Sequence, residues 1–265
     1  MSPIEPLPHI FPCRPAYIFS DVDDTLTLDR RLPREAFNAL HDLNEAGIPV
    51  VPVTGASAGW CDCILRTWPV DTVIGENGAF IMSREEEQVS CRFMQDEETR
   101  LHNLGKLRAL AAAIDKEIPE ARLTGDCNYR ITDIAYDIGQ DRTLSPGSIQ
   151  DVLAICRVHH VHARASSIHI NIWLGDYSKS TTASSLLKHR GVSENQTVFI
   201  GDSPNDEAMF TTWTTTVGVA NIAPFLSALP HAPMYVTRYP GGLGFAELAA
   251  AVLRTDTPYH GLLTR

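Results

Sequence analysis

The segment Tyr17-Ile-Phe-Ser-Asp-Val-Asp-Asp-Thr-Leu-Thr27 runs from an apolar stretch directly into three carboxylates within four positions. These carboxylates are Asp21, Asp23 and Asp24. Ionised carboxylates this close repel one another, and burying them is costly unless a cation or hydrogen-bond donors compensate. A hard divalent cation such as Mg2+ takes oxygen ligands and commonly bridges carboxylates to phosphate. The segment therefore predicts a metal-dependent phosphate site at the carboxyl end of a buried strand.

The composition is that of a globular protein large enough to bury a core. The chain has 265 residues, of which 44% are hydrophobic and 20% charged, and its formal net charge is -10. Without a Lys/Arg cluster, a nucleic-acid surface is not expected. The six cysteines lack a zinc-ligand spacing and are expected to be reduced. No apolar run approaches the roughly 18 residues that span a bilayer, and residues 1–8 lack the pattern of a signal peptide. We therefore expect a cytoplasmic protein with no membrane partner.

Near the start, apolar strand-like segments alternate with segments of helical periodicity. The expected order is strand 17–20, helix 34–46, strand 48–54, helix 57–67 and strand 72–75. A similar alternation resumes after residue 178. This order predicts an α/β fold with a Rossmann-like parallel sheet. Residues 1–15 hold five prolines and are expected to be extended and weakly structured.

The middle of the chain has a different pattern and predicts an inserted domain. Residues 85–100 are charged and irregular, 101–118 have a helical pattern, and alternating strand patterns surround 130–138 and 160–173. We therefore expect a discontinuous catalytic core formed by residues 1–82 and 178–265. An α+β cap domain formed by residues 83–177 is expected to determine substrate specificity.

Four polar features follow predicted strands or open the helices beside them. They are Asp21/Asp23/Asp24, Thr54-Gly-Ala-Ser57, Lys179 and Gly201-Asp-Ser-Pro-Asn-Asp206. Open α/β sheets bind ligands at the carboxyl ends of their strands, so we expect the four features to converge. Together they supply what phosphoryl transfer needs: a carboxylate nucleophile, a second carboxyl as acid and base, groups that hold phosphate, and carboxylates for a metal.

Taken in this order, the four features resemble the motifs of the haloacid dehalogenase (HAD) superfamily of phosphatases. The match covers the whole predicted core. The insert between the second and third motifs resembles the large cap of the Cof-type, or IIB, subfamily, and Gly75-Glu-Asn-Gly-Ala79 resembles the stretch that enters such a cap. The resemblance implies an α/β HAD core that carries an α+β type IIB cap.

The resemblance also implies a role for each motif residue. Asp21 would be the nucleophile, and Asp23 would be the general acid and base. Thr54, Gly55 and Lys179 would bind the phosphate.

The implied cofactor is Mg2+. Its site would comprise Asp21, the main-chain carbonyl of Asp23, and Asp202, with Asp206 supporting both the metal and the lysine. Asp24 is expected to have a structural role.

Candidates for substrate contact lie in the insert and in the loops beside the motifs. His169 and Asn171 alternate with isoleucines and therefore share one strand face, which either looks toward the active site or is solvated. Arg164 is a further candidate for contact with an anion. The full set of expected substrate residues is Asn77, Arg130, His169, Asn171 and Asn205.

Two positions depart from the Cof-type pattern, because Ala56 replaces the usual Arg and Ser180 replaces the usual Gly. Neither change affects the residues of the chemical step. The sequence predicts a Mg2+-dependent phosphatase that hydrolyses a small phosphorylated metabolite, expected to be a sugar phosphate, through an aspartyl-phosphate. The alternatives are a phosphomutase acting on a hexose phosphate and a non-enzymatic phospho-acceptor or binding protein on the same fold. The sequence does not indicate which oligomeric state the protein has.

Overall fold

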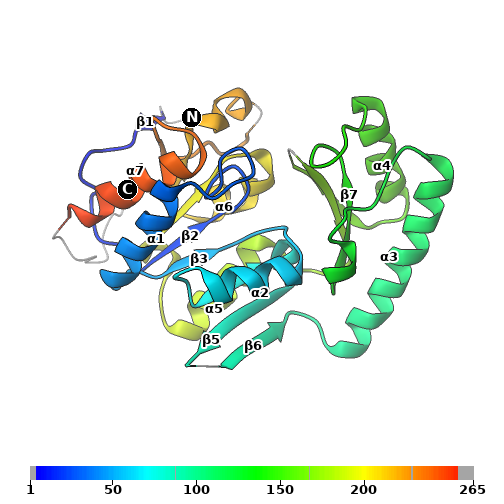
Figure 1. Cartoon of the computed structure of the whole chain (residues 1–265), viewed down its shortest axis with the longest axis horizontal. Helices are drawn as coiled ribbons and strands as arrows, with labels where there is room; N and C mark the ends of the chain where they lie inside the picture. Colours follow the sequence, from blue (N-terminus) through cyan, green and yellow to red (C-terminus); the bar gives the residue numbers. More distant parts are fainter. Residues whose placement is uncertain (1–3, 87, 167, 228, 256–265) are drawn as a thin grey trace.

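Six parallel strands form the main sheet of the protein (Figure 1). The structure, a computed structural model, describes residues 4–255 except 87, 167 and 228, so both ends of the predicted core lie outside the described residues. In spatial order the strands are β1 (Glu5–Pro6), β12 (Tyr235–Val236), β11 (Thr215–Gly218), β10 (Thr197–Gly201), β2 (Tyr17–Ser20) and β3 (Val50–Pro52). All five pairings between neighbours are parallel. The Rossmann-like α/β core is thus confirmed.

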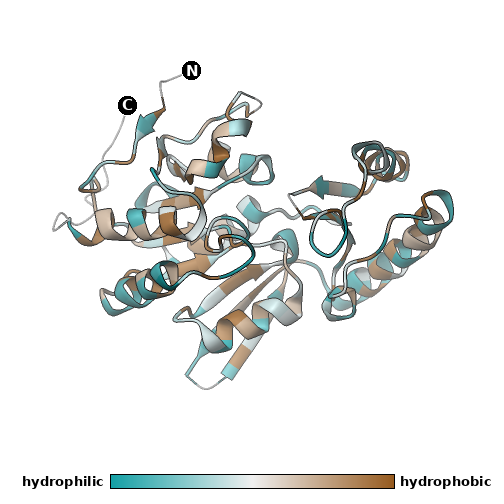
Figure 2. Cartoon of the chain, turned by 45° about the horizontal axis from the view of Figure 1, so that its top comes forward, coloured by the Kyte–Doolittle hydropathy of each residue, from teal (hydrophilic) through white to brown (hydrophobic). Residues whose placement is uncertain are grey.

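Helices cover both faces of this sheet. They are α1 (Arg34–Glu45), α2 (Ala58–Thr67), α5 (Lys179–Arg190), α6 (Glu207–Thr212) and α7 (Gly241–Leu253). Consecutive residues of β2 point to opposite faces: Ile18 packs in a cluster with α1, α2 and α7, and Phe19 packs in a cluster with α5 and α6. Figure 2 shows the result, a core whose strands are largely hydrophobic between helices with hydrophilic outer faces.

A hairpin extends the core beyond β3. Strand β4 (Thr72–Gly75) lies beside β3 through a parallel bridge between Val53 and Ile74, and β5 (Phe80–Glu85) and β6 (Gln88–Phe93) pair with it antiparallel. The expectation of an irregular segment at 85–100 is therefore wrong for β6. Val89 and Phe93 of β6 pack against the hydrophobic cluster that Ile18 forms with α1, α2 and α7, and the residues between them are exposed. The backbone hydrogen bonds between β6 and β5 do not depend on the charged side chains.

The N-terminal segment is also more ordered than expected. Glu5 and Pro6 form β1, which pairs in parallel with β12 at the edge of the main sheet. A proline is tolerated there because an edge strand leaves one row of backbone groups unpaired.

The inserted segment folds as a three-stranded antiparallel sheet backed by two helices. The strand order is β7 (Asp133–Asp137), β9 (His169–Trp173) and β8 (His162–Ala165). Two helices, α3 (Glu97–Glu117) and α4 (Pro146–Val158), pack on one face of this sheet. The opposite face of the cap sheet is turned to the core (Figure 1), because Trp173 of β9 packs in the same hydrophobic cluster as Ile18 of β2. Neither α3 nor any other described helix is apolar enough over a sufficient length to cross a membrane.

A single carboxylate, Glu76, joins the core to the first residues of the cap sheet. Glu76 follows β4 and is fully buried. Its oxygens accept the backbone N–H groups of Ala58 (2.9 Å), Ile131 (3.0 Å) and Thr132 (2.7 Å), and also the hydroxyl of Thr132. Because buried N–H groups need acceptors, this carboxylate fixes the start of β7 against α2.

Replacing Glu76 with Ala would leave these buried donors without an acceptor. We expect the free energy of unfolding to fall by roughly 3 kcal/mol or more, since each unsatisfied buried donor costs on the order of 1–3 kcal/mol. Chemical denaturation measures the change. Glu85→Ala, which removes an exposed carboxylate from β5, is the matched control and should change stability by less than about 0.5 kcal/mol. Equal stabilities of the two variants would contradict the role of Glu76.

Candidate active site

Three buried aspartates meet at the carboxyl ends of β2 and β10, which are neighbours in the sheet. Asp21 follows β2, Asp202 follows β10, and Asp206 ends the short turn after it. One carboxylate oxygen from each lies within 4.8 Å of the others. The Asp21 N–H donates to the carbonyl of Ile200 (3.0 Å), and the Asp202 N–H donates to Asp206 Oδ2 (3.1 Å). Parallel strand pairing thus brings together carboxylates that are far apart in the sequence.

Lys179 lies between two of these aspartates. It is the first residue of α5, and the hydroxyl of Ser178 caps this helix. Lys179 Nζ donates to Asp21 Oδ1 (2.5 Å) and to Asp206 Oδ1 (2.9 Å). Burial disfavours the charged form, but attraction to Asp206 and Asp21 outweighs it and raises the pKa of Lys179. An ammonium has three N–H groups, so one remains to contact a ligand.

Burial shifts Asp21, Asp23 and Asp202 toward their protonated forms. Desolvation, together with repulsion from Asp206 and Asp21, raises the pKa of Asp202. Desolvation also raises the pKa of Asp21, and Lys179 opposes this shift. The pKa of Asp23 is raised to about 6, again by burial and against the effect of Lys179. Without a cation, the cluster therefore retains protons at pH values where an exposed aspartate is ionised.

The donor set fits a hard divalent cation. The converging groups of Asp21, Asp202 and Asp206 offer carboxylate oxygens, which Mg2+ prefers, and the cluster includes no histidine or cysteine among the described residues. A bound cation would favour the ionised carboxylates and so offset the desolvation that raises the pKa of Asp21 and of Asp202.

The loop after β3 presents a hydroxyl to the same region. Thr54 is fully buried, and its Oγ1 accepts the N–H of Ala56 (3.0 Å), which leaves the hydroxyl proton for a ligand. The carbonyl of Gly55 accepts from Arg130 Nη1 (3.1 Å) and from Asn171 Nδ2 (3.0 Å). A side chain at position 55 would lie 3.0 Å from the Asn77 amide, so only glycine fits without displacing it. The cap thus contacts the loop that carries the predicted phosphate ligand.

The cap covers the acidic cluster and leaves a small pocket of about 20 Å3. The residues that line it are Asp21, Asp23, Gly55, Ser166, His169, Asn171, Asp202, Ser203 and Asn205. Three of the expected substrate residues, His169, Asn171 and Asn205, therefore lie at the pocket. The face of β9 that carries His169 and Asn171 looks toward the core, which resolves the alternative left open by the alternation pattern.

His169 is an uncharged member of this pocket. Its Nε2 lies 2.5 Å from Gln140 Oε1. Burial, aided by the charge of Arg130, lowers the pKa of His169 to about 4. The imidazole is consequently neutral near pH 7 and offers hydrogen bonds but no positive charge.

The other two expected substrate residues lie beside the pocket and do not line it. The Arg130 side chain is fully buried and donates to Asp133 (2.9 Å), Asp126 (3.3 Å) and the Gly55 carbonyl. Its guanidinium is thus engaged by protein groups. Asn77 is buried next to Gly55, and its Nδ2 has no hydrogen-bond partner among the described residues.

Several residues that no sequence pattern singled out support the site. Asn221 donates to the carbonyl of Asp24 (3.0 Å) and so holds the backbone of the loop after β2. Ser166 and Ser203 line the pocket. Ser203 lies within the motif that predicted Asp202, but nothing local marks Asn221 or Ser166, because folding alone brings Asn221 to the Asp24 carbonyl and Ser166 to the pocket.

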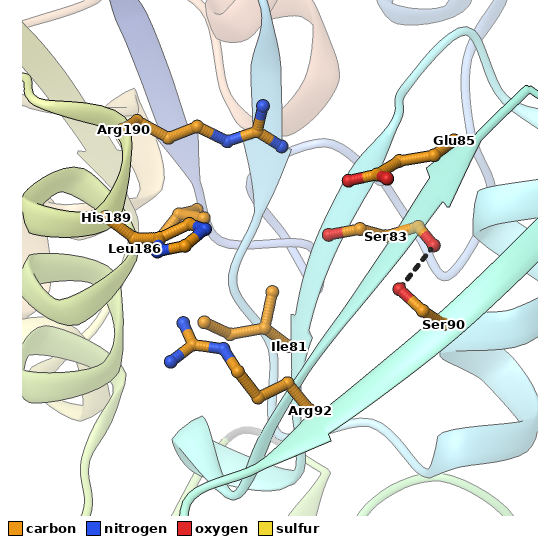
Figure 3. A pocket seen from close by; sticks show the side chains of 8 residues that line it. All are labelled: Ile81, Ser83, Glu85, Ser90, Arg92, Leu186, His189 and Arg190. Atoms are coloured by element: carbon orange, nitrogen blue, oxygen red, sulfur yellow. Dashed lines mark hydrogen bonds between the residues drawn. The ribbon is translucent and has the colours of Figure 1, made fainter.

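A second hollow, of about 460 Å3, lies between the β5–β6 hairpin and the end of α5. Figure 3 shows Arg92, His189 and Arg190 around it, with Ser83 and Ser90 on the hairpin side. None of the predicted site residues lines this hollow, so the motif chemistry belongs to the closed pocket under the cap.

The chain belongs to the haloacid dehalogenase-like hydrolase family, because the profile of that family matches residues 18–114 and 138–233. The expected family is therefore confirmed, and the protein is an enzyme of the hydrolase class. The non-enzymatic alternative is set aside on this ground.

Curated relatives match over most of the chain. The phosphoglycolate phosphatase of Methanothermobacter thermautotrophicus is 27% identical over 228 residues, which are 86% of this chain and 94% of the relative. The phosphoglycolate phosphatase of Pyrobaculum neutrophilum is 29% identical over 244 residues, which are 88% of this chain and 93% of the relative.

Solved structures share the fold at low sequence identity. Thermoplasma acidophilum 0175 matches with a TM-score of 0.74 and 17% identity, over 89% of this chain and 97% of that protein. The sucrose-phosphatase of Synechocystis matches with a TM-score of 0.66 and 17% identity, over 90% and 98% of the two chains. These matches confirm a HAD-type core with an inserted cap.

The raised pKa of Asp202 leads to a prediction about the metal-free protein. A carboxyl whose pKa is higher in the folded than in the unfolded state destabilises the fold as pH rises, because the folded state holds the proton more tightly. Asp202→Asn should therefore raise Tm in EDTA, and by more at about pH 9 than at about pH 5. Asp62→Asn, at an exposed ion pair, is the control and should show no such trend. A variant no more stable than the parent at the higher pH would refute this reading.

Proposed function

We propose that the protein is a Mg2+-dependent phosphatase that hydrolyses a small phosphorylated metabolite. The observation that carries the proposal is the buried Lys179, which hydrogen-bonds both Asp21 and Asp206 at the end of a family-typical sheet. This arrangement neutralises a carboxylate nucleophile and leaves one N–H for a phosphoryl oxygen. The two curated relatives described above, both named phosphoglycolate phosphatases, support the same reaction class.

In the proposed reaction, Asp21 attacks the phosphorus and forms an aspartyl-phosphate as the ester P–O bond breaks. Asp23 donates its proton to the leaving oxygen and then takes a proton from the water that attacks the phosphorus. The second attack breaks the bond to Asp21 and releases inorganic phosphate. A pKa near 6 suits Asp23 to both halves of this cycle, because the group must be protonated in one and ionised in the other.

The remaining residues hold the phosphate and the cation. The hydroxyl of Thr54 and the free N–H of Lys179 would bind phosphoryl oxygens, beside the turn at Gly55. Asp21, Asp202 and Asp206 would hold Mg2+ with the main-chain carbonyl of Asp23. When bound, the cation would neutralise the charge shared by nucleophile and phosphate.

The cap would exclude water and select the leaving group. We propose that the hairpin up to Phe93 belongs to the core, since it pairs with β4, and that the cap comprises the following residues up to about 177. Sugar phosphates, expected from the sequence, and phosphoglycolate, suggested by the relatives, are the two substrate classes. Asn171, Asn205 and the neutral His169 can hydrogen-bond the hydroxyl groups of a sugar, and the amide N–H groups of the two asparagines can also donate to the carboxylate of phosphoglycolate.

Asp21→Asn should lower kcat by about three orders of magnitude or more, since an amide does not form the phosphoenzyme. Turnover of p-nitrophenyl phosphate at fixed Mg2+ measures the loss, and Asp62→Asn should retain the parent rate. Substantial activity in Asp21→Asn would overturn the assignment of the nucleophile. Release of free phosphate, as opposed to an isomerised phosphate ester, separates this phosphatase from a phosphomutase.

Mg2+ binding should release protons, because the cation displaces protons from carboxyls of raised pKa. Affinity should therefore rise between about pH 6 and about pH 8. Calorimetric titration in two buffers of different ionisation enthalpy measures both effects. Asp202→Asn should bind Mg2+ more weakly and release fewer protons. An affinity that does not change with pH would argue against this electrostatic account.

A further inference from the structure

The face of the cap sheet that looks toward the core carries one arginine outside the network around Arg130. Arg164 of β8 pairs directly with Asn171 of β9, so both side chains lie on the same face of the sheet. The neighbouring residue Ala163 packs in the cap's own hydrophobic cluster, on the opposite face. Asn171 in turn lines the pocket and donates to the carbonyl of Gly55. Arg164 is therefore placed one strand away from a residue that touches the phosphate loop.

The guanidinium of Arg164 is available to a ligand. The residue is exposed, and it has no hydrogen bond or ion pair to the residues that the structure describes. Arg130, in contrast, is held by Asp126 and Asp133. Arg30 donates to the carbonyls of residues 139 and 140.

The pocket needs a positive charge if its leaving group is anionic. None of the residues that line it carries a positive charge: Asp23 and Asp202 are acidic, and His169 is neutral. A guanidinium offers two parallel N–H groups that match the two oxygens of a carboxylate.

We propose that Arg164 forms an anion subsite that binds a carboxylate on the leaving group, so that the preferred substrates are phosphate esters of small hydroxy acids. The inference rests on the proposed phosphatase function and names its substrate class. It assigns to the cap a positive charge that the loop after β3, with Ala56, does not supply.

The test compares two substrates with the same carbon skeleton, 3-phosphoglycerate and glycerol 3-phosphate, which differ in a carboxylate. Steady-state kinetics at saturating Mg2+ and constant ionic strength give kcat/KM for the parent, Arg164→Ala and Arg164→Lys. In Arg164→Ala, we expect kcat/KM to fall about 10- to 100-fold for 3-phosphoglycerate, mainly through KM, and less than about 2-fold for glycerol 3-phosphate. Arg164→Lys should recover part of the loss, since it keeps the charge without the planar pair of donors.

Arg157→Ala is the matched control, because α4 lies on the opposite face of the cap sheet. It should leave both substrates unchanged. Equal losses for the two substrates in Arg164→Ala, or no loss for either, would overturn the subsite. If either of these results is found while the parent still hydrolyses p-nitrophenyl phosphate, the phosphatase function stands and only the subsite fails. If the parent hydrolyses no phosphate ester, the proposed function itself fails, and the subsite with it.

Discussion

The structure depends on one electrostatic constraint: buried carboxylates at the edge of a parallel sheet must be balanced by positive charge. Asp21, Asp202 and Asp206 converge because β2 and β10 are neighbours that run in the same direction. Lys179 supplies one compensating charge from the start of α5. One ammonium does not balance three carboxylates, and burial together with this unbalanced negative charge raises the pKa of Asp21 and of Asp202. A divalent cation would offset the negative charge that remains.

The cap is joined to this site by hydrogen bonds to backbone atoms. Glu76 binds the N–H groups at the start of β7, and Arg130 and Asn171 both donate to the carbonyl of Gly55. The loop that presents Thr54 is thus positioned partly by the inserted domain. Asn171 both lines the pocket and donates to the Gly55 carbonyl, so under the proposed function substrate selection and phosphate binding would be coupled.

Two arginines on the core-facing side of the cap differ in role because their burial and their hydrogen-bond partners differ. Arg130 is buried among acids and has its donors occupied, so it organises the protein. Arg164 is exposed on the same side, and its guanidinium makes no hydrogen bond to the described residues, so it is available to bind a ligand. Burial and partners, which no single position in the sequence reveals, account for the difference.

The sequence by itself determined the α/β core, most of its elements and the motif residues, because strand alternation and clustered carboxylates are local signals. It missed the β6 strand, whose pairing depends on a neighbouring backbone more than on its own charged side chains. Only the tertiary structure decided which face of β9 meets the core, that Arg130 is engaged by Asp126 and Asp133, and that Glu76 joins the two parts of the protein. These features arise from contacts between residues distant in the chain, and no local periodicity specifies which distant groups will meet.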